Sequence, residues 1–202
     1  MTPQLQYLID IYGIDLSHGS PIAIPGVHRR DFGKLLKALD CHRGAEIGVA
    51  NGEFSEMILQ GHPDAELYGV DIRHTRQAKA RLGHLPRYHF LHNRSHSASK
   101  TFADASLDFV YIDGDHTFRG AAEDLESWVK KVRPGGVVAG HDLVLDTKER
   151  WWADDAHCGK VTWAVNAYIQ AYRIPTWFVL GEPEMLERNG QTVGVYSWMW
   201  IR

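Results

Sequence analysis

Short apolar runs alternate with amphipathic segments along the chain, and this alternation indicates an α/β fold. The apolar runs predict strands over Ala45–Val49, Leu67–Val70, Tyr88–Leu91, Leu107–Ile112 and Val137–Ala139. Apolar residues at helical spacing predict helices over Gln4–Tyr12, Asp31–Leu39, Phe54–Leu59, Thr162–Tyr172, and from Ala121 to the stop at Pro134-Gly135-Gly136. Strands that alternate with helices in this way form a parallel sheet.

The last part of the chain has a different pattern. Two apolar runs, Thr176–Leu180 and Val193–Trp200, are separated only by a polar connection through Glu182–Asn189. Without a helix between them, two such strands pair in antiparallel fashion. The sequence therefore predicts a mostly parallel, Rossmann-like sheet of seven strands that ends in a C-terminal antiparallel β-hairpin, with helices on both faces.

Length and composition favour one main domain. The chain has 202 residues, 44% of them hydrophobic, which is enough for one substantial core. Residues 1–28 combine a short helix with a turn-rich stretch that contains Pro21 and Pro25, and we interpret them as an N-terminal cap. The main domain is expected over residues 29–202.

Charge and cysteine usage narrow the expected partners. Lys and Arg total 22 against 25 Asp and Glu, so the net charge of −3 gives no reason to expect a nucleic-acid partner. No stretch has the length of a membrane span and the N-terminus has no secretory pattern, so we expect a cytoplasmic protein without a membrane partner. The two cysteines lack CxxC spacing, which argues against a thiolate zinc site. A homo-oligomer stays open.

A glycine-containing turn follows the first predicted strand of the main domain. Gly48 and Gly52 lie between this strand and a helix, so the backbone can turn sharply and approach a ligand at the carboxyl edge of the sheet. Asp71 ends the next strand, where a carboxylate can accept hydrogen bonds from both ribose hydroxyls of an adenosine-containing ligand. A nicotinamide site would require Gly-x-Gly-x-x-Gly, but Ala50 and Glu53 interrupt that pattern.

In chain order, these and later motifs resemble a class I methyltransferase that depends on S-adenosylmethionine (SAM). The resemblance covers about residues 30–202 and is carried by AEIGVANGEFSEMIL, LYGVDI, LDFVYIDGDHTFRGAAEDLESWVKKVRPGGVVAGHD and SWMWIR. The most similar group is the small bacterial group related to macrocin, cephalosporin and sugar O-methyltransferases. In these enzymes the sheet ends in a hairpin, whereas a dinucleotide-binding sheet continues in parallel.

The resemblance implies a cofactor site with SAM as the ligand. It places Glu46, Gly48 and Gly52 along the methionine part of SAM, within a loop that also contains Asn51. Asp71 would bind the ribose and Ile72 the adenine face. Ser95 would lie in the region after the third strand, although its neighbourhood reads equally well as a polar loop.

Polar residues follow two neighbouring strands. Asp113-Gly114-Asp115-His116 comes after the fourth strand and Gly140-His141-Asp142 after the fifth, so both groups should meet beside the methyl donor. Asp113 and Asp142 suit a hard cation such as Mg²⁺, and His141 would also tolerate Mn²⁺, Fe²⁺ or Zn²⁺. Without a metal, Asp113 could instead contact the cofactor near its sulfonium or the acceptor.

Methyl transfer to a hydroxyl requires a base and a stabilised oxygen. His116 has an ordinary pKa near neutrality and is the candidate base, with Asp113 beside it. The resemblance supports these roles, because related sugar O-methyltransferases have an Asp-x-x-His motif after the fourth strand. Those relatives usually carry an acidic pair after the fifth strand, where this chain has His141-Asp142. Asp115 is expected to cap the helix that follows Thr117.

The sequence therefore predicts an enzyme that transfers a methyl group from SAM to a hydroxyl of a small molecule such as a sugar, polyketide or phenol. Mg²⁺ or Mn²⁺ would assist. The alternatives are an N-methyltransferase, a non-catalytic SAM-binding module, and a nicotinamide-dependent oxidoreductase.

Residues 143–160 form a long polar connection beside the site and suggest a lid, in which Trp151 and Trp152 would stack on the acceptor or serve packing. His28, Arg29 and Arg30 face either the crevice or solvent.

Overall fold

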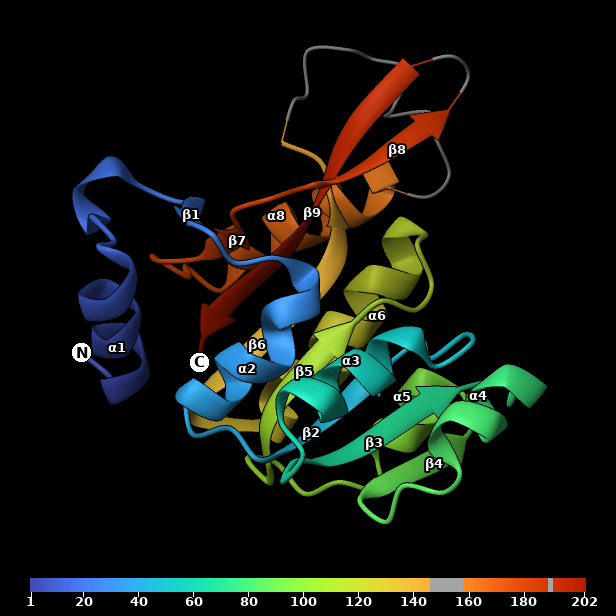
Figure 1. Ribbon diagram of the computed structural model, residues 1–202. Coiled ribbons are helices and arrows are strands. Elements are labelled where there is room, and N and C mark those ends of the chain that lie inside the picture. Colours follow the sequence, from blue (N-terminus) through green and yellow to red (C-terminus); the bar gives the residue numbers. More distant parts are fainter. Residues whose placement is uncertain (146–157, 189–190) are drawn as a thin grey trace.

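One large sheet organises the molecule. In this computed structural model, the structure describes residues 1–145, 158–188 and 191–202 (Figure 1). The strand order is β1-β7-β9-β6-β5-β2-β3-β4, and β8 pairs with β9 outside this path. The strands are β1 (Ile22–Ile24), β2 (Arg43–Ile47), β3 (Glu66–Asp71), β4 (Tyr88–His92), β5 (Leu107–Ile112), β6 (Val132–Leu143), β7 (Phe178–Leu180), β8 (Glu184–Arg188) and β9 (Gln191–Ile201).

The central strands run parallel to one another, and β9 runs in the opposite direction. Strands β4, β3, β2, β5 and β6 pair in parallel with their neighbours, whereas β9 is antiparallel to β6, β7 and β8. The sheet thus contains the seven predicted strands with the predicted antiparallel end, and this is the Rossmann-like methyltransferase fold. The antiparallel β9 distinguishes it from a dinucleotide-binding sheet that continues in parallel.

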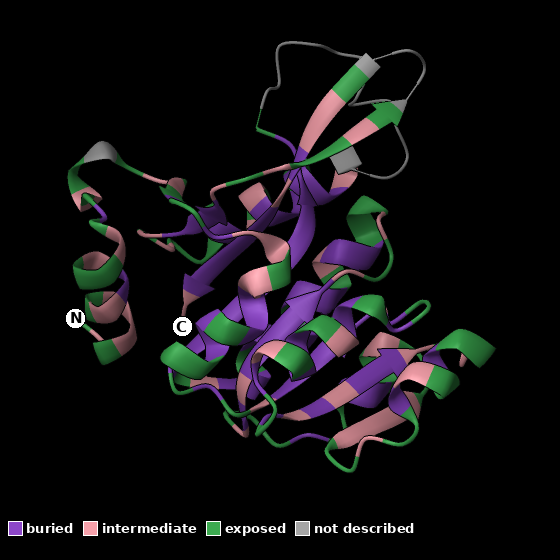
Figure 2. Cartoon of the chain, viewed as in Figure 1, coloured by how far each residue is buried: buried purple, intermediate pink, exposed green. Residues whose placement is uncertain are grey.

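Helices cover both faces of the sheet. The helices are α1 (Pro3–Tyr12), α2 (Phe32–Ala38), α3 (Glu53–Gly61), α4 (Arg76–Leu82), α5 (Ser95–Ser99), α6 (Phe118–Trp128) and α8 (Cys158–Ala171), with one-turn 3₁₀ segments η1 (Leu16–His18), η2 (Arg29–Asp31) and η3 (Val129–Lys131). Buried residues of α1 to α4 form one apolar cluster against the sheet, and those of α5, α6 and α8 form a second. Figure 2 shows the buried central strands between exposed outer helical turns.

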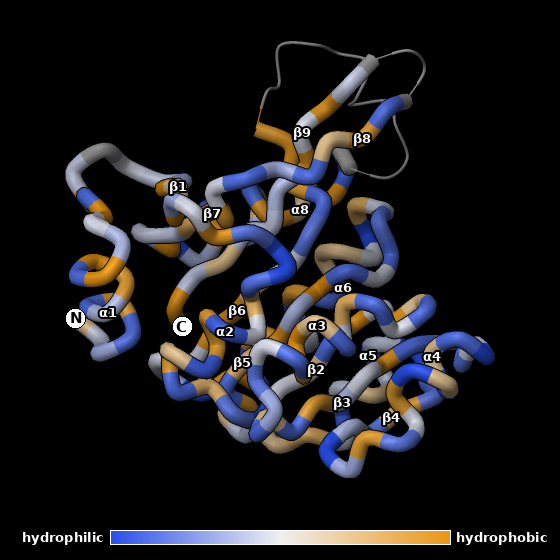
Figure 3. Tube along the Cα trace, viewed as in Figure 1, coloured by the Kyte–Doolittle hydropathy of each residue, from blue (hydrophilic) through white to orange (hydrophobic). Residues whose placement is uncertain are grey.

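Strand β9 contributes to both clusters because its side chains alternate in direction. Trp198 and Trp200 lie in the second cluster, and Met199 between them lies in the first. The rings of the two tryptophans are stacked, with centroids 5.2 Å apart. In the helices the alternation has a longer period, and hydrophobic and hydrophilic positions intersperse along α1 and α3 (Figure 3). The predicted helix and strand periods therefore correspond to real buried faces.

Several elements were not predicted. Strands β1 and β8 and helices α4 and α5 fall in stretches that are short or polar, and β6 is much longer than its apolar run. β1 extends the sheet edge by pairing with β7, although it lies within residues 1–28. Leu8, Ile14 and Val27 from the same segment belong to the first apolar cluster. The division between a cap and a main domain at residue 29 stays a prediction, but the cap packs into the common core.

Among the described residues, no helix combines the length and the apolar character that crossing a bilayer requires.

Candidate functional site

The glycine turn after β2 lies against the end of β5. Gly48 has a φ of +89°, and a Cβ atom at this position would lie 2.0 Å from the carbonyl oxygen of Asp113. Only a residue without a side chain permits this approach and this conformation. Gly48 therefore lets the backbone of the predicted cofactor loop contact the backbone of Asp113, the first of the candidate catalytic residues after β5.

Asp71 holds the same loop from the other side. Its Oδ2 atom accepts hydrogen bonds from the backbone N–H groups of Val49 and Ala50, both at 2.9 Å, and its Oδ1 atom accepts one from Arg73 N at 2.8 Å. Oδ2 thus has both of its acceptor sites in use, and Oδ1 retains capacity for a further donor. The carboxylate thus fixes the loop backbone while remaining partly exposed at the end of β3.

The remaining predicted cofactor residues surround this corner. Asn51 and Gly52 complete the turn, with Asn51 exposed and Gly52 at the start of α3 with a φ of +79°. Ile72 is 62% exposed, and its carbonyl lies 2.9 Å from His92 Nε2. The exposed isoleucine offers an apolar face next to Asp71. The structure therefore brings the turn, Asp71 and Ile72 together at one edge of the sheet, and their contact with SAM stays a prediction.

Glu46 is buried beneath the turn. Its side chain is nearly inaccessible and accepts a hydrogen bond from Ser55 Oγ of α3. Burial raises the pKa of Glu46 to about 8, more than the Ser55 hydrogen bond lowers it, and the negative charge of Asp113 adds to the rise. The carboxyl group is thus largely protonated at neutral pH unless a cation comes close.

The side chain of Ser95 is engaged within the protein. Its hydroxyl donates a hydrogen bond to Asp124 of α6 and accepts one from Trp128 Nε1 at 2.8 Å. Ser95 begins α5, so the residue ties this short helix to α6. Ser95 lies shortly after the end of β4, and its contact with the cofactor stays a prediction.

The ends of β5 and β6 bring the predicted metal residues together. Ligand atoms of Asp113, His141 and Asp142 all lie within 4.8 Å of one another, and two of the three side chains are buried. Asp142 has a φ of +61°, a conformation that non-glycine residues rarely adopt, and it lies where the pairing of β6 with β9 shifts register. This bulge turns the Asp142 carboxylate toward the end of β5.

His116 bridges the two carboxylates. Its Nε2 atom lies 3.1 Å from Asp142 Oδ2 and 3.4 Å from Asp113 Oδ1. The hydrogen bond to Asp113 raises the pKa of His116, and the charge of Asp142 adds to this effect against the opposing effect of burial. The predicted base is therefore within reach of two of the three predicted metal ligands.

The predicted cap of the helix after Thr117 was wrong. Thr117 itself is the N-cap of α6, and its hydroxyl accepts a hydrogen bond from Gly120 N at 3.0 Å. Asp115 lies two residues earlier and accepts a hydrogen bond from Thr117 N at 2.9 Å. A hydroxyl at the helix start needs no help from the preceding carboxylate, which instead stabilises the turn before it.

Arg29 also lies in the site, and the sequence left its orientation open. Its Nη2 atom donates a hydrogen bond to Asp113 Oδ2, and its guanidinium lies over the ring of Phe54, 4.4 Å from the centroid. Burial lowers the pKa of Arg29, but the surrounding Tyr111 and acidic groups outweigh burial and raise it overall. Arg29 is therefore a permanent positive charge beside Asp113.

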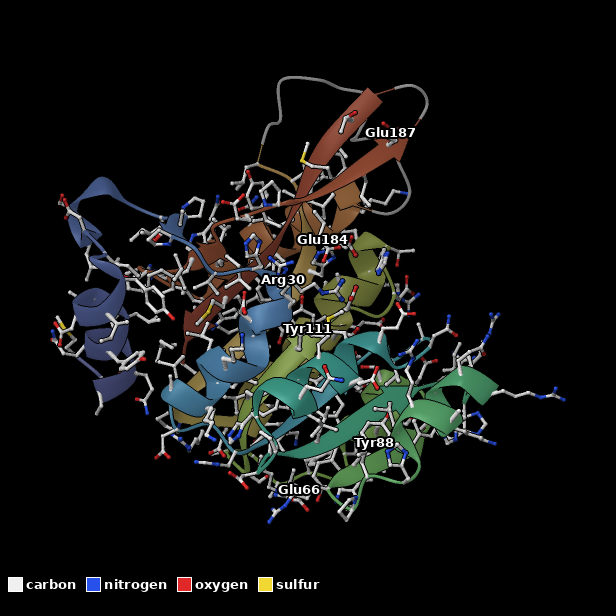
Figure 4. All side chains as sticks on the ribbon, viewed as in Figure 1. Arg30, Glu66, Tyr88, Tyr111, Glu184 and Glu187 are labelled. Carbon is white, nitrogen blue, oxygen red and sulfur yellow. The ribbon has the colours of Figure 1, made fainter. Side chains whose placement is uncertain are left out.

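Glu184 was not predicted at all. It opens β8, and Figure 4 shows it at the base of the β8–β9 hairpin, near the end of β5 that carries Tyr111. Its two carboxylate oxygens lie 3.6 Å from Arg29 Nη1 and 3.6 Å from His141 Nε2. No motif marks a glutamate in a polar connection, so only the hairpin geometry reveals it.

Trp151 and Trp152, predicted near the acceptor, lie outside the described residues.

Comparisons with known proteins agree with this arrangement. Residues 45–143 match the sequence model of a family described as a methyltransferase domain. The matched region runs from β2 through β6 and contains the turn, Asp71 and the polar ends of β5 and β6. The narrower likeness to macrocin and cephalosporin O-methyltransferases stays a prediction.

The chain also resembles an uncharacterized protein of Sinorhizobium fredii called y4gI, with 30% identity over 106 residues. This match includes 50% of the chain but only 11% of that protein, so the chain spans about a tenth of its relative's length.

Several solved structures share the fold. Cofactor-bound Rv0187 from MTB has a TM-score of 0.62 at 17% identity, and the match covers 100% of this chain and 91% of that one. A 1,6-didemethyltoxoflavin-N1-methyltransferase of Burkholderia thailandensis, with bound S-adenosylhomocysteine, has a TM-score of 0.58 at 14% identity and coverages of 88% and 80%. An O-methyltransferase family protein of the same species has a TM-score of 0.58 at 16% identity and coverages of 86% and 55%.

Proposed function

We propose that the chain is a SAM-dependent methyltransferase that methylates a hydroxyl group of a small molecule. One observation carries the proposal: the glycine turn held by Asp71 and the polar group Asp113, His116 and Asp142 meet at the same carboxyl edge of the sheet. This edge is where α/β enzymes bind their ligands. The match to a methyltransferase domain over the same residues supports the proposal.

The proposed cofactor position follows from the donors and acceptors at this edge. Asp71 would accept hydrogen bonds from the ribose hydroxyls, and the exposed Ile72 would pack on the adenine. The turn containing Gly48, Asn51 and Gly52 would follow the methionine part. Glu46, buried below this turn, would gain its negative charge when the ammonium group of the cofactor approaches, because a nearby cation favours the ionised carboxylate.

The proposed chemistry uses the residues after β5 and β6. His116 would take the hydroxyl proton of the acceptor at Nδ1, while Asp113 and Asp142 hold the imidazole through Nε2 and stabilise its protonated form. Most of the rate increase in such a transfer comes from holding the acceptor oxygen in line with the methyl group. Asp113 lies against the glycine turn, so it would lie between the cofactor and the acceptor.

The donor set also fits a divalent cation. Two carboxylates and an imidazole converge within 4.8 Å, which suits Mn²⁺ and, through the carboxylates, Mg²⁺. Asp113, His141 and Asp142 would hold the ion. A bound cation would lower the pKa of an acceptor hydroxyl. His116 bridges two of these ligands, so it would move aside or share them when an ion binds.

A nitrogen acceptor is the second candidate. One of the fold relatives is an N-methyltransferase, and neither the turn nor the fold distinguishes oxygen from nitrogen acceptors. A non-catalytic SAM-binding module is a third. The described residues around the site include a candidate base, which such a module would not need.

The experiment measures transfer of a labelled methyl group from SAM to a panel of hydroxyl and amine compounds, with and without Mg²⁺ or Mn²⁺. His116→Asn should lower turnover by about 10²–10⁴-fold with little change in binding of S-adenosylhomocysteine. His84→Asn, at an exposed position just after the end of α4, is the matched control. Transfer only to amines would support the second candidate, and tight cofactor binding without any transfer would support the third.

A further inference from the structure

We propose that Arg29 and His141 together bind a ligand carboxylate at the place where the Glu184 carboxylate lies in the described structure. This inference rests on the proposed function and adds the chemical group that its ligand must present. The carboxylate belongs either to the methionine end of SAM or to the acceptor, and the experiment below separates these two sources.

Arg29 has hydrogen-bonding capacity that the protein does not use. Its Nη2 atom is bound to Asp113, but its Nε atom is fully shielded from solvent and has no hydrogen-bond partner among the described residues. Its Nη1 atom faces Glu184 Oε1 at 3.6 Å, beyond hydrogen-bond distance. A guanidinium offers five N–H donors in a fixed plane that suits the two oxygens of a carboxylate.

The His141 ring presents a second unused atom to the same place. The residue is 6% exposed, and its Nε2 atom has no hydrogen-bond partner in the part of the chain that the structure describes. Its Nδ1 atom lies 3.4 Å from Asp142 Oδ1, on the side of the candidate metal site. A histidine that binds a metal through Nδ1 carries its proton on Nε2 and donates it outward. Nε2–H would then point at Glu184.

Glu184 occupies this position without filling it well. One oxygen lies 3.6 Å from Arg29 Nη1 and the other 3.6 Å from His141 Nε2, so a single carboxylate spans both donors but forms a hydrogen bond with neither. Its side chain is 46% exposed and belongs to β8, which among the described strands pairs with β9 alone. The side chain can therefore leave without disturbing the main sheet. A carboxylate that enters from the site would approach both donors more closely.

The surroundings favour an anion at this point. The guanidinium is stacked on Phe54 at 4.4 Å and lies 5.6 Å from the centre of the Tyr111 ring, and the side chain is only 21% exposed. A partly desolvated N–H group without a partner is unfavourable, and a charged acceptor relieves this cost. Asp113 is near enough to orient the arginine but uses only one edge of it. The Nη1 atom of Arg29 faces the position that the Glu184 carboxylate occupies.

The cofactor arm of the experiment compares two probes by calorimetry. S-adenosylhomocysteine carries the methionine-type carboxylate, and 5′-methylthioadenosine has the same adenosine and thioether but no amino acid. If the cofactor supplies the carboxylate, Arg29→Gln should weaken S-adenosylhomocysteine about tenfold or more and leave 5′-methylthioadenosine unchanged. Arg30→Gln, at the exposed neighbouring position (Figure 4), is the matched control and should change neither.

The acceptor arm uses protein saturated with S-adenosylhomocysteine. Aliphatic and aromatic hydroxy acids are compared with their methyl esters for binding to the wild type and Arg29→Gln. If the acceptor supplies the carboxylate, the wild type should prefer the free acids about tenfold or more, and Arg29→Gln should abolish this preference. If Arg29→Gln alters neither the cofactor comparison nor the acid preference, the proposal is wrong.

Glu184→Gln keeps the proposal testable if the arginine variant does not fold. Removing the charge of the resident carboxylate should leave binding of the carboxylate-bearing probe unchanged or make it tighter. Weaker binding would show that Glu184 itself helps to bind the ligand, and it would overturn the proposal that the ligand carboxylate replaces the Glu184 carboxylate. If the wild type binds neither adenosine probe, the proposed function is refuted as well. If the protein binds both probes and Arg29→Gln changes neither their relative affinities nor the preference for acids over esters, only this inference is refuted.

Discussion

Asp71→Asn tests how the cofactor loop and the proposed ribose contact depend on one carboxylate. Asp71 accepts three backbone hydrogen bonds, two from the turn at Oδ2 and one from Arg73 at Oδ1. An asparagine has one carbonyl oxygen and one NH₂ group, so it must direct a donor at one of these sets of N–H groups. Hydrogen bonds to charged groups contribute ~1.5–3 kcal/mol each, so the free energy of unfolding should fall by ~2–3 kcal/mol.

The assays are thermal unfolding without ligand and calorimetry with S-adenosylhomocysteine. For a chain of this size, a loss of ~2–3 kcal/mol lowers Tm by roughly 4–12 °C. Loss of one charge-assisted hydrogen bond to ribose should weaken binding by about 10- to 100-fold. Asp64→Asn is the control, because Asp64 is exposed and its contact with Lys37 is 3.9 Å long. An unchanged Tm would refute the role in the loop, and a lower Tm with unchanged affinity would refute the ribose contact.

Three further substitutions test other parts of the site. Gly48→Ala places a Cβ 2.0 Å from the Asp113 carbonyl at a φ of +89°, so it should lower Tm and abolish binding of S-adenosylhomocysteine; a variant with wild-type affinity would contradict the close approach. Burial raises the pKa of Glu46 from 4.5 to about 8, so the folded state holds a proton that the unfolded state releases, and stability should fall as pH rises between these values. Glu46→Gln should remove this part of the pH dependence of Tm, and an unchanged profile would argue against the raised pKa. Ser95→Ala breaks the hydrogen bond to Asp124 and should cost ~1–3 kcal/mol of stability, while a larger effect on cofactor affinity than on Tm would show a direct contact with SAM.

The fold was predictable where packing follows a simple period. Strands buried on both faces give continuous apolar runs, and β5 was predicted with the bounds that it has in the structure. β1 and β8 were missed because they are short edge elements, and the polar positions of β8 give no apolar run. β6 was predicted too short, since its pairing extends through Pro134 and the glycines that normally end an element.

The site was predictable to a similar degree. Parallel strands that are adjacent in a sheet end at the same edge, so Asp113, His116, His141 and Asp142 could be grouped from their positions after two strands. The electrostatics could not be predicted in this way. The pKa of Glu46 depends on its burial, and that of His116 on the carboxylates on either side of it.

The sequence by itself determined the α/β alternation, the antiparallel end and the residues at the strand termini, because these depend on local periodicity and chain order. Only the tertiary structure decided that Arg29 turns toward Asp113 and that Glu184 reaches Arg29 and His141. These contacts join residues that are far apart in the chain, and their side chains carry no local pattern. Their positions depend on how η2 and the β8–β9 hairpin pack over the end of the sheet.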